Sequence, residues 1–82
     1  MESVLSVTPK DNHLLEFRFN TGELRIFDAT PYLEKGVFKK LKVATLFNQA
    51  YVAFDTVCWP GSLDISPTTL YDKSIIIITN KS

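Results

Sequence analysis

The alternation of apolar and polar residues along the chain predicts a protein built mainly of short strands. Residues 13–19 alternate most regularly, because Leu15, Phe17 and Phe19 share one face of an extended strand. Residues 23–27 also alternate and are predicted to form a second strand that pairs with the first. Further strands are predicted over residues 2–8, 51–59 and 74–80.

The register of the hairpin over residues 13–27 follows from this pattern. A two-residue turn at Thr21-Gly22 sets the apolar residues of the two strands opposite each other, with Phe17 against Ile26. A shift by one residue would set Phe17 against Arg25. We therefore predict the register that sets Phe17 opposite Ile26. Thr21 is not ideal in a two-residue turn, so a four-residue loop of the same register is the alternative.

A second hairpin is predicted around Pro60-Gly61, a dipeptide typical of tight turns. If Trp59 pairs with Ser62, then Cys58 faces Leu63 on an inner face and Val57 lies opposite Asp64 on the other. This register places Cys58 in the core as a small apolar residue.

Helices are expected to be short. Ser66-Pro67 has the residue types preferred at the N-cap and first position of a helix, which then has room for little more than one turn. Residues 32–48 contain the main helical pattern. Gly36 interrupts it, so we predict several short helical pieces there.

The C-terminal run Ile75-Ile76-Ile77-Ile78 is unusual because it does not alternate. It fits a central strand that is buried on both faces. The alternative is an association surface, in which two chains meet through the isoleucines and complete a thin core. Left uncovered, such a run would favour aggregation.

Together these elements predict an α+β fold in a single domain of residues 1–82. We expect a mainly antiparallel sheet of five to six short strands, with short helices packed on one face. At this length folding buries only about 60% of the surface of the unfolded chain, so the core is thin.

Composition gives no general support for a membrane or nucleic-acid partner. The 82 residues hold nine basic and nine acidic side chains, and a net charge of zero gives no global attraction to nucleic acid or anionic membranes. No apolar run approaches the length of a membrane span, and the first residues lack a signal-peptide pattern. With a single Cys, these features lead us to expect a cytoplasmic protein.

The residues that commonly carry catalysis or bind metals are sparse. One His and one Cys, His13 and Cys58, cannot form a common zinc site, and we expect neither a metal nor a cofactor. Asp28 and Asp64 could serve a small enzyme if one of them were buried in a pocket beside another polar group. Local roles in turns and at strand ends fit both better. We expect no catalytic residues.

A basic segment lies between residues 30 and 42, where four Lys and one Glu leave a local charge of +3. It motivates the hypothesis of a nucleic-acid-associated regulator that contacts phosphates. The segment has no Arg and the chain as a whole is neutral, which is more typical of a solvated helix face. Its cations are Lys35, Lys39, Lys40 and Lys42.

Several short motifs resemble the DUF2442 family of small bacterial domains of unknown function. They are Trp59-Pro60-Gly61, Leu63-Asp64-Ile65, Pro67, Leu70-Tyr71, Gly36-Val37-Phe38 with Leu41 and Phe47, and Thr21-Gly22 with Asp28. The resemblance covers nearly the whole chain and implies a fold without implying an activity. Members of this family are often encoded beside another small uncharacterised domain, so the resemblance suggests half of a toxin–antitoxin-like pair.

These observations lead to the hypothesis of a non-enzymatic protein-interaction module, either homodimeric or paired with a small partner protein. Aromatic side chains dominate protein interfaces, so an exposed Trp59 or Tyr71 could anchor a partner. The alternative for Trp59 is that it closes the core against the helical segment. The remaining candidate contact residues are Ile75, Ile76, Ile77 and Ile78.

Overall fold

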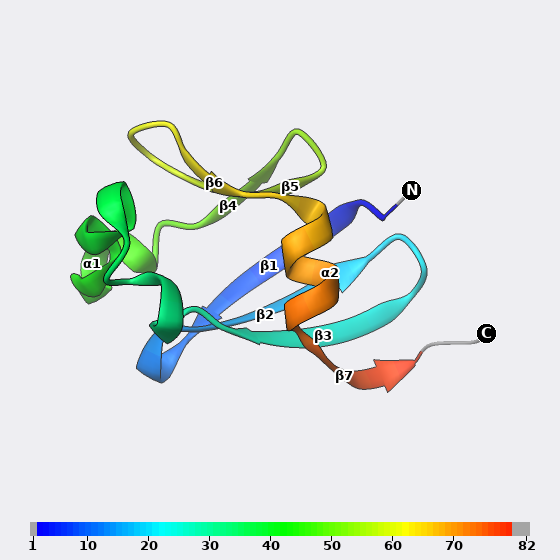
Figure 1. Cartoon of the computed structure of the whole chain (residues 1–82). Helices are drawn as coiled ribbons and strands as arrows, with labels where there is room; N and C mark the ends of the chain where they lie inside the picture. Colours follow the sequence, from blue (N-terminus) through cyan, green and yellow to red (C-terminus); the bar gives the residue numbers. More distant parts are fainter. Residues whose placement is uncertain (1, 80–82) are drawn as a thin grey trace.

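The structure, a computed structural model, describes residues 2–79 and consists of two antiparallel sheets that enclose a common core (Figure 1). The strands are β1 (Val4–Lys10), β2 (Leu14–Phe19), β3 (Glu23–Asp28), β4 (Tyr51–Ala53), β5 (Thr56–Trp59), β6 (Leu63–Ile65) and β7 (Ile75–Thr79). The helices are α1 (Ala44–Phe47), α2 (Pro67–Lys73) and the 3₁₀ helices η1 (Asp11–His13), η2 (Thr30–Tyr32) and η3 (Gly36–Lys42).

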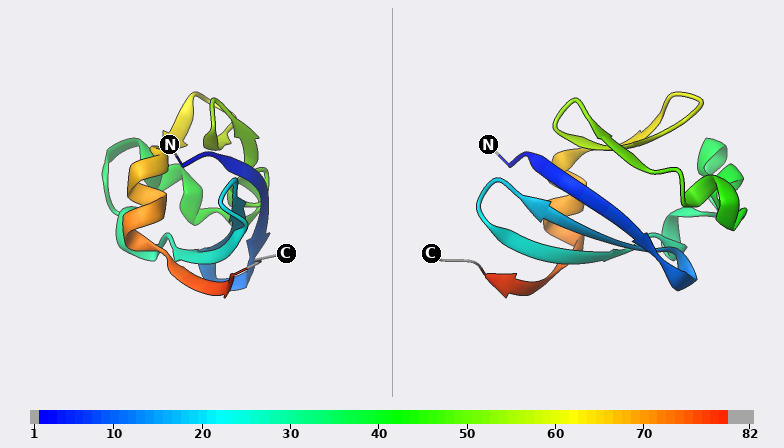
Figure 2. Two further views of the ribbon diagram at one scale, coloured as in Figure 1. Left: turned by 90° about the vertical axis from the view of Figure 1, so that its right-hand side faces the viewer. Right: turned by 180° about the vertical axis from the view of Figure 1, so that it is seen from behind.

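The larger sheet has the strand order β1-β2-β3-β7, and the smaller has the order β4-β5-β6. Seen from the end, the two sheets and α2 surround the core, and β7 lies on the far side of α2 from the smaller sheet (Figure 2). The α+β class and the antiparallel pairing are therefore confirmed. The described strands number seven and divide between two sheets. After β3 the chain leaves the first sheet through the helical segment and forms the second sheet, and after α2 it returns to the first sheet as β7.

The core consists of the inward faces of both sheets and the residues that close its two ends. Its largest fully buried side chains include Trp59, Phe17, Phe19, Phe27 and Phe47. The inward face predicted for β2 is confirmed, since Leu15, Phe17 and Phe19 are all buried.

The helices have the predicted character. Residues 30–47 form short pieces, two of them 3₁₀ helices, and no long helix. Helix α2 begins after Ser66, whose Oγ accepts a hydrogen bond from the backbone N–H of Thr69 at 3.2 Å, and Pro67 occupies the first turn.

The register predicted for the β2–β3 hairpin is wrong by one residue. Phe17 pairs with Arg25, and Leu15 pairs with Phe27. Two-residue hairpin turns of the favoured kind need a positive φ at a position where the β-branched Thr21 would stand. The observed loop is one residue longer, and the residue in it that takes a positive φ is Gly22, at 91°. Arg25 consequently points into the protein together with Phe27.

The β5–β6 register also differs from the prediction. Trp59 pairs with Leu63, and Cys58 pairs with Asp64. A two-residue turn would require a positive φ at Pro60, which its ring forbids. The loop lengthens to include Ser62, and Gly61 and Ser62 take the positive φ values, 92° and 65°.

The isoleucine run forms β7, which is an edge strand and not the central strand that full burial would require. It pairs with β3 alone among the described strands. Asn80, the last residue of the predicted strand, and the side chain of Ile78 lie outside what the structure describes.

The turn between β4 and β5 presents an aromatic side chain to solvent. Ala53 pairs with Thr56, so Phe54 and Asp55 form a two-residue loop with φ values of 53° and 66°. These are the angles of a type I′ turn, which Asn and Gly adopt easily and a bulky residue does not. Phe54 is 90% exposed and therefore gains little from burial.

Replacing Phe54 with asparagine should stabilise the protein by about 1 kcal/mol, because the strain of a left-handed Phe is relieved. Urea denaturation of the variant and the parent measures the difference. Val37→Asn, at another exposed apolar position whose φ is not positive, is the control and should show no gain. An unchanged or lowered midpoint for Phe54→Asn would show that the turn is not strained.

Candidate interaction surface

The exposed edge of the larger sheet is the most distinctive surface of the molecule. Ile75 is 70% exposed, Ile76 is 44% exposed and Ile77 is 46% exposed. Within the described part of the chain, the side of β7 that faces away from β3 meets no other strand. Its outward backbone N–H and C=O groups can therefore accept an added strand.

A bulge in β7 interrupts the pairing of the isoleucines with β3. Leu24 pairs with Ile78 and Arg25 pairs with Ile76, so Ile77 is an extra residue in β7. Residues paired directly across two strands lie on the same face of the sheet. Ile76 therefore lies on the core side with Arg25, while Ile75 lies on the outer side opposite Ile26.

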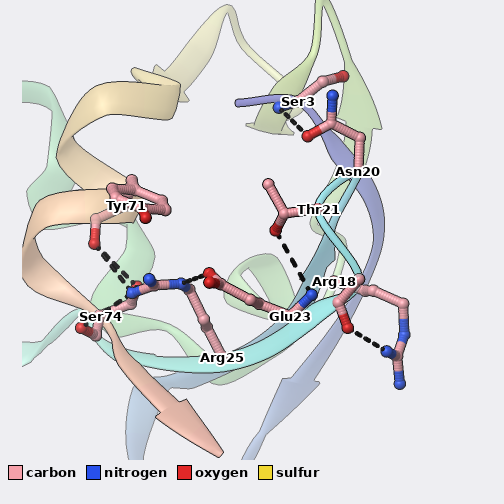
Figure 3. A network of polar contacts seen from close by, with 9 residues as sticks. Ser3, Arg18, Asn20, Thr21, Glu23, Arg25, Tyr71 and Ser74 are labelled. Carbon is pink, nitrogen blue, oxygen red and sulfur yellow. Dashed lines mark hydrogen bonds and ion pairs between the residues drawn. The ribbon is translucent and has the colours of Figure 1, made fainter. Parts of the chain in front are cut away.

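Arg25, on β3, connects β3 to the junction between α2 and β7 through a largely buried polar network (Figure 3). Its Nε donates to Glu23 Oε1 at 2.8 Å, and its Nη1 donates to the carbonyl of Tyr71 and to Ser74 Oγ, both at 3.1 Å. The guanidinium is thus shared between a carboxylate and the C-terminal end of a helix, where unpaired carbonyls concentrate negative charge.

Tyr71 covers the same guanidinium. The Arg25 carbon Cζ lies 4.1 Å from the centre of the Tyr71 ring and 5.9 Å from that of Phe19. Such stacking suits a planar, weakly hydrated cation. Tyr71 is half-buried against the core, so its ring supports Arg25 and is not presented as a free anchor.

Sequence reasoning missed Arg25 because it assumed that a charged residue in an alternating strand points to solvent. Glu23 two residues earlier, on the same strand face, was the available signal. The acceptors Tyr71 and Ser74 are more than 45 residues away and leave no trace in a local pattern.

Trp59 lies in the core and not on a contact surface. It is fully buried, its ring packs at 5.8 Å from that of Phe47, and its Nε1 donates to the Phe47 carbonyl at 2.8 Å. The hypothesis of an exposed Trp anchor is wrong, because the β5–β6 register turns this side chain inward. The alternative, that Trp59 closes the core against the helical segment, describes the structure.

The basic segment forms η3 and the residues before it. Because a 3₁₀ helix has three residues per turn, Lys39 and Lys42 lie on one face of η3. Lys42 Nζ lies 2.7 Å from Glu34 Oε2, and Lys35 Nζ lies 5.2 Å from the centre of the Tyr32 ring. Lys40 is exposed. The Glu34 contact reduces the charge available to a phosphate backbone.

Asp28 and Asp64 are both exposed, so neither has the buried setting that the small-enzyme hypothesis requires. Asp28 Oδ1 accepts a hydrogen bond from the backbone N–H of Thr30 at 2.9 Å. Hydrogen bonds from Thr30 lower the pKa of Asp28 below its usual range. Asp28 thus has the local turn role expected of it.

Cys58 is buried, although not on the predicted face. It pairs with Asp64 and with Tyr51 on the side of β5 that faces away from Trp59 and the main core cluster. Burial, with a smaller contribution from the negative charge of Asp64, raises the pKa of the Cys58 thiol. A raised pKa disfavours the thiolate and makes this a poor nucleophile.

His13 does not assist Cys58. Its Nε2 lies 3.1 Å from the Lys42 carbonyl, and its ring packs edge-on against Phe47. Across residues 2–79, no three His, Cys, Asp or Glu side chains are grouped so that they could hold a metal ion. In the same part of the chain, no helix has the length and apolar character needed to span a bilayer.

Comparison with known proteins places the chain in a family. No curated protein and no solved structure matches it. One family model, described as a protein of unknown function (DUF2442), matches residues 4–75 and so covers most of the chain. The matched segment includes the β2–β3 and β5–β6 hairpins, Arg25 with its partners, and the start of β7. The chain therefore belongs to the DUF2442 family.

Proposed function

We propose that this protein is a non-enzymatic, cytoplasmic interaction module whose contact surface is the β7 edge. The observation that carries the proposal is an uncharged edge strand with Ile75, Ile76 and Ile77 exposed on both of its faces. A partner strand added at this edge gains main-chain hydrogen bonds and covers the isoleucines.

The two edges of the larger sheet differ in how they are protected. Edge strand β1 has Pro9, the charged Lys10 and a register irregularity between Val4 and Ser6, all of which discourage strand addition. Its beginning is also tied to the smaller sheet, since the Val4 N–H donates to the Asp55 carbonyl at 2.9 Å. β7 has neither proline nor charge, which supports its use as a contact edge. Its bulge at Ile77 is the one protective feature that the two edges share.

Photo-crosslinking in the source cell tests this proposal. A photoreactive phenylalanine analogue at position 77 should give a discrete crosslinked species, because a partner covers the β7 edge. The same analogue at Val37, an exposed apolar position on η3, is the matched control. Crosslinking at position 77 that does not exceed the control would contradict the proposal.

A further inference from the structure

We infer that the strand added at the β7 edge is β7 of a second copy, paired antiparallel across a two-fold axis perpendicular to the sheet. Two four-stranded sheets would then join into one continuous sheet. This inference rests on the proposed function and names the partner. Such an interface is isologous, so each contact between two residues occurs twice.

The sequence of β7 is self-complementary. Its five residues, Ile75–Thr79, carry no charge. If the axis passes through Ile76, Ile75 faces Ile77 of the second copy and no like charges oppose each other among these residues. A net charge of zero removes the long-range repulsion that would otherwise separate two identical chains.

The outer face of the sheet extends the apolar contact beyond the edge. Ile75 lies beside Ile26 on this face, and Leu24 is on the same side of β3. Ile26 and Leu24 are half-buried, although in the views of the fold no helix covers this face (Figure 2). A two-fold axis perpendicular to the sheet keeps the outer face outward in both copies. The apolar rows of the two copies would therefore meet side by side at the axis.

The edge is also held in place before pairing. Arg25 Nη1 binds Ser74 Oγ, immediately before the first residue of β7, and Ile76 pairs with Arg25 itself. A strand that is already ordered loses less conformational entropy when it binds. This lowers the cost of association for a small interface.

Sedimentation and light scattering over a concentration series test the inference. The wild-type protein should reach twice the 9.3 kDa mass of one chain at micromolar concentrations. Ile77→Lys should raise the dimer dissociation constant roughly tenfold or more, because two like charges then lie near the axis. Val37→Lys adds the same charge away from β7 and should leave the constant unchanged. Ile75→Lys, at the most exposed of the three isoleucines, serves if Ile77→Lys fails to fold.

Disulfide trapping gives a second readout that does not depend on affinity. Paired residues of antiparallel strands have Cα atoms about 4.5–5.5 Å apart, within disulfide range. Cysteine placed singly at positions 75, 76 and 77 should yield a covalent dimer for the position on the axis. Val37→Cys should not, and neither should the wild type, whose Cys58 is buried.

The outcomes separate the inference from the proposed function. A wild-type monomer at several hundred micromolar, with no disulfide dimer at positions 75–77, would overturn self-pairing. If position 77 then crosslinks to a different protein in cells, the proposed contact function stands and only the partner is wrong. If it crosslinks to nothing, both are wrong.

Discussion

Replacing Arg25 with methionine should lower the free energy of unfolding by about 3 kcal/mol. The side chain is only 7% exposed and its partner Glu23 is 18% exposed, so the variant leaves a mostly buried carboxylate without its cation. It also leaves the Tyr71 carbonyl and Ser74 Oγ without their donor. Urea denaturation measures the loss. Amide hydrogen exchange should show faster exchange in Ile75–Thr79, because the junction between α2 and β7 loses its side-chain attachment to β3.

Two variants serve as controls for this experiment. Arg18→Met removes the same group from the neighbouring strand, where the guanidinium donates to the Gly22 carbonyl, and should cost about 1 kcal/mol. Arg25→Lys keeps the charge and loses the planar fork, so its stability should lie between those of the parent and Arg25→Met. Equal losses for Arg18→Met and Arg25→Met would show that the network contributes nothing specific.

Replacing Trp59 with alanine should cost about 3–5 kcal/mol, the usual range for truncating a large buried aromatic side chain. A domain of 82 residues has a total stability of about 4–12 kcal/mol, so this variant should be partly or wholly unfolded at 37 °C. Thermal unfolding followed by near-ultraviolet circular dichroism measures the effect.

Trp59→Phe separates packing from hydrogen bonding. It keeps an aromatic ring beside Phe47 and loses the donor to the Phe47 carbonyl, for an expected cost of about 1–3 kcal/mol. Proteolysis of this variant should begin near α1, which that bond holds. A Trp59→Ala variant as stable as the parent would contradict the assignment of Trp59 to the core.

The local elements could be predicted from the sequence because they depend on neighbouring residues. The inward face of β2 follows from the alternation of Leu15, Phe17 and Phe19, and the start of α2 follows from Ser66-Pro67. Gly36 was likewise sufficient to predict short helical pieces. Each of these features depends on residues within one strand or one helical turn. A strand buries one face, and a cap accepts a hydrogen bond from a backbone N–H of the first turn.

The hairpin registers depended on details of turn geometry. Both loops have one residue more than a two-residue turn, because Pro60 cannot adopt a positive φ and Thr21 adopts it poorly. One residue reverses which face of the partner strand is buried. That reversal brought Trp59 and Arg25 inside and moved Cys58 away from the main cluster.

The sequence by itself therefore determined the α+β class, the inward aromatic face of β2 and the capped start of α2, since these depend on short-range patterns. Only the tertiary structure decided that the isoleucine strand lies at an edge and that an arginine is buried beside it. Besides the nearby Glu23, the acceptors that make such burial tolerable come from the end of α2 and from Ser74, far along the chain. A buried charge requires partners, and partners distant in sequence become neighbours only when the chain has folded.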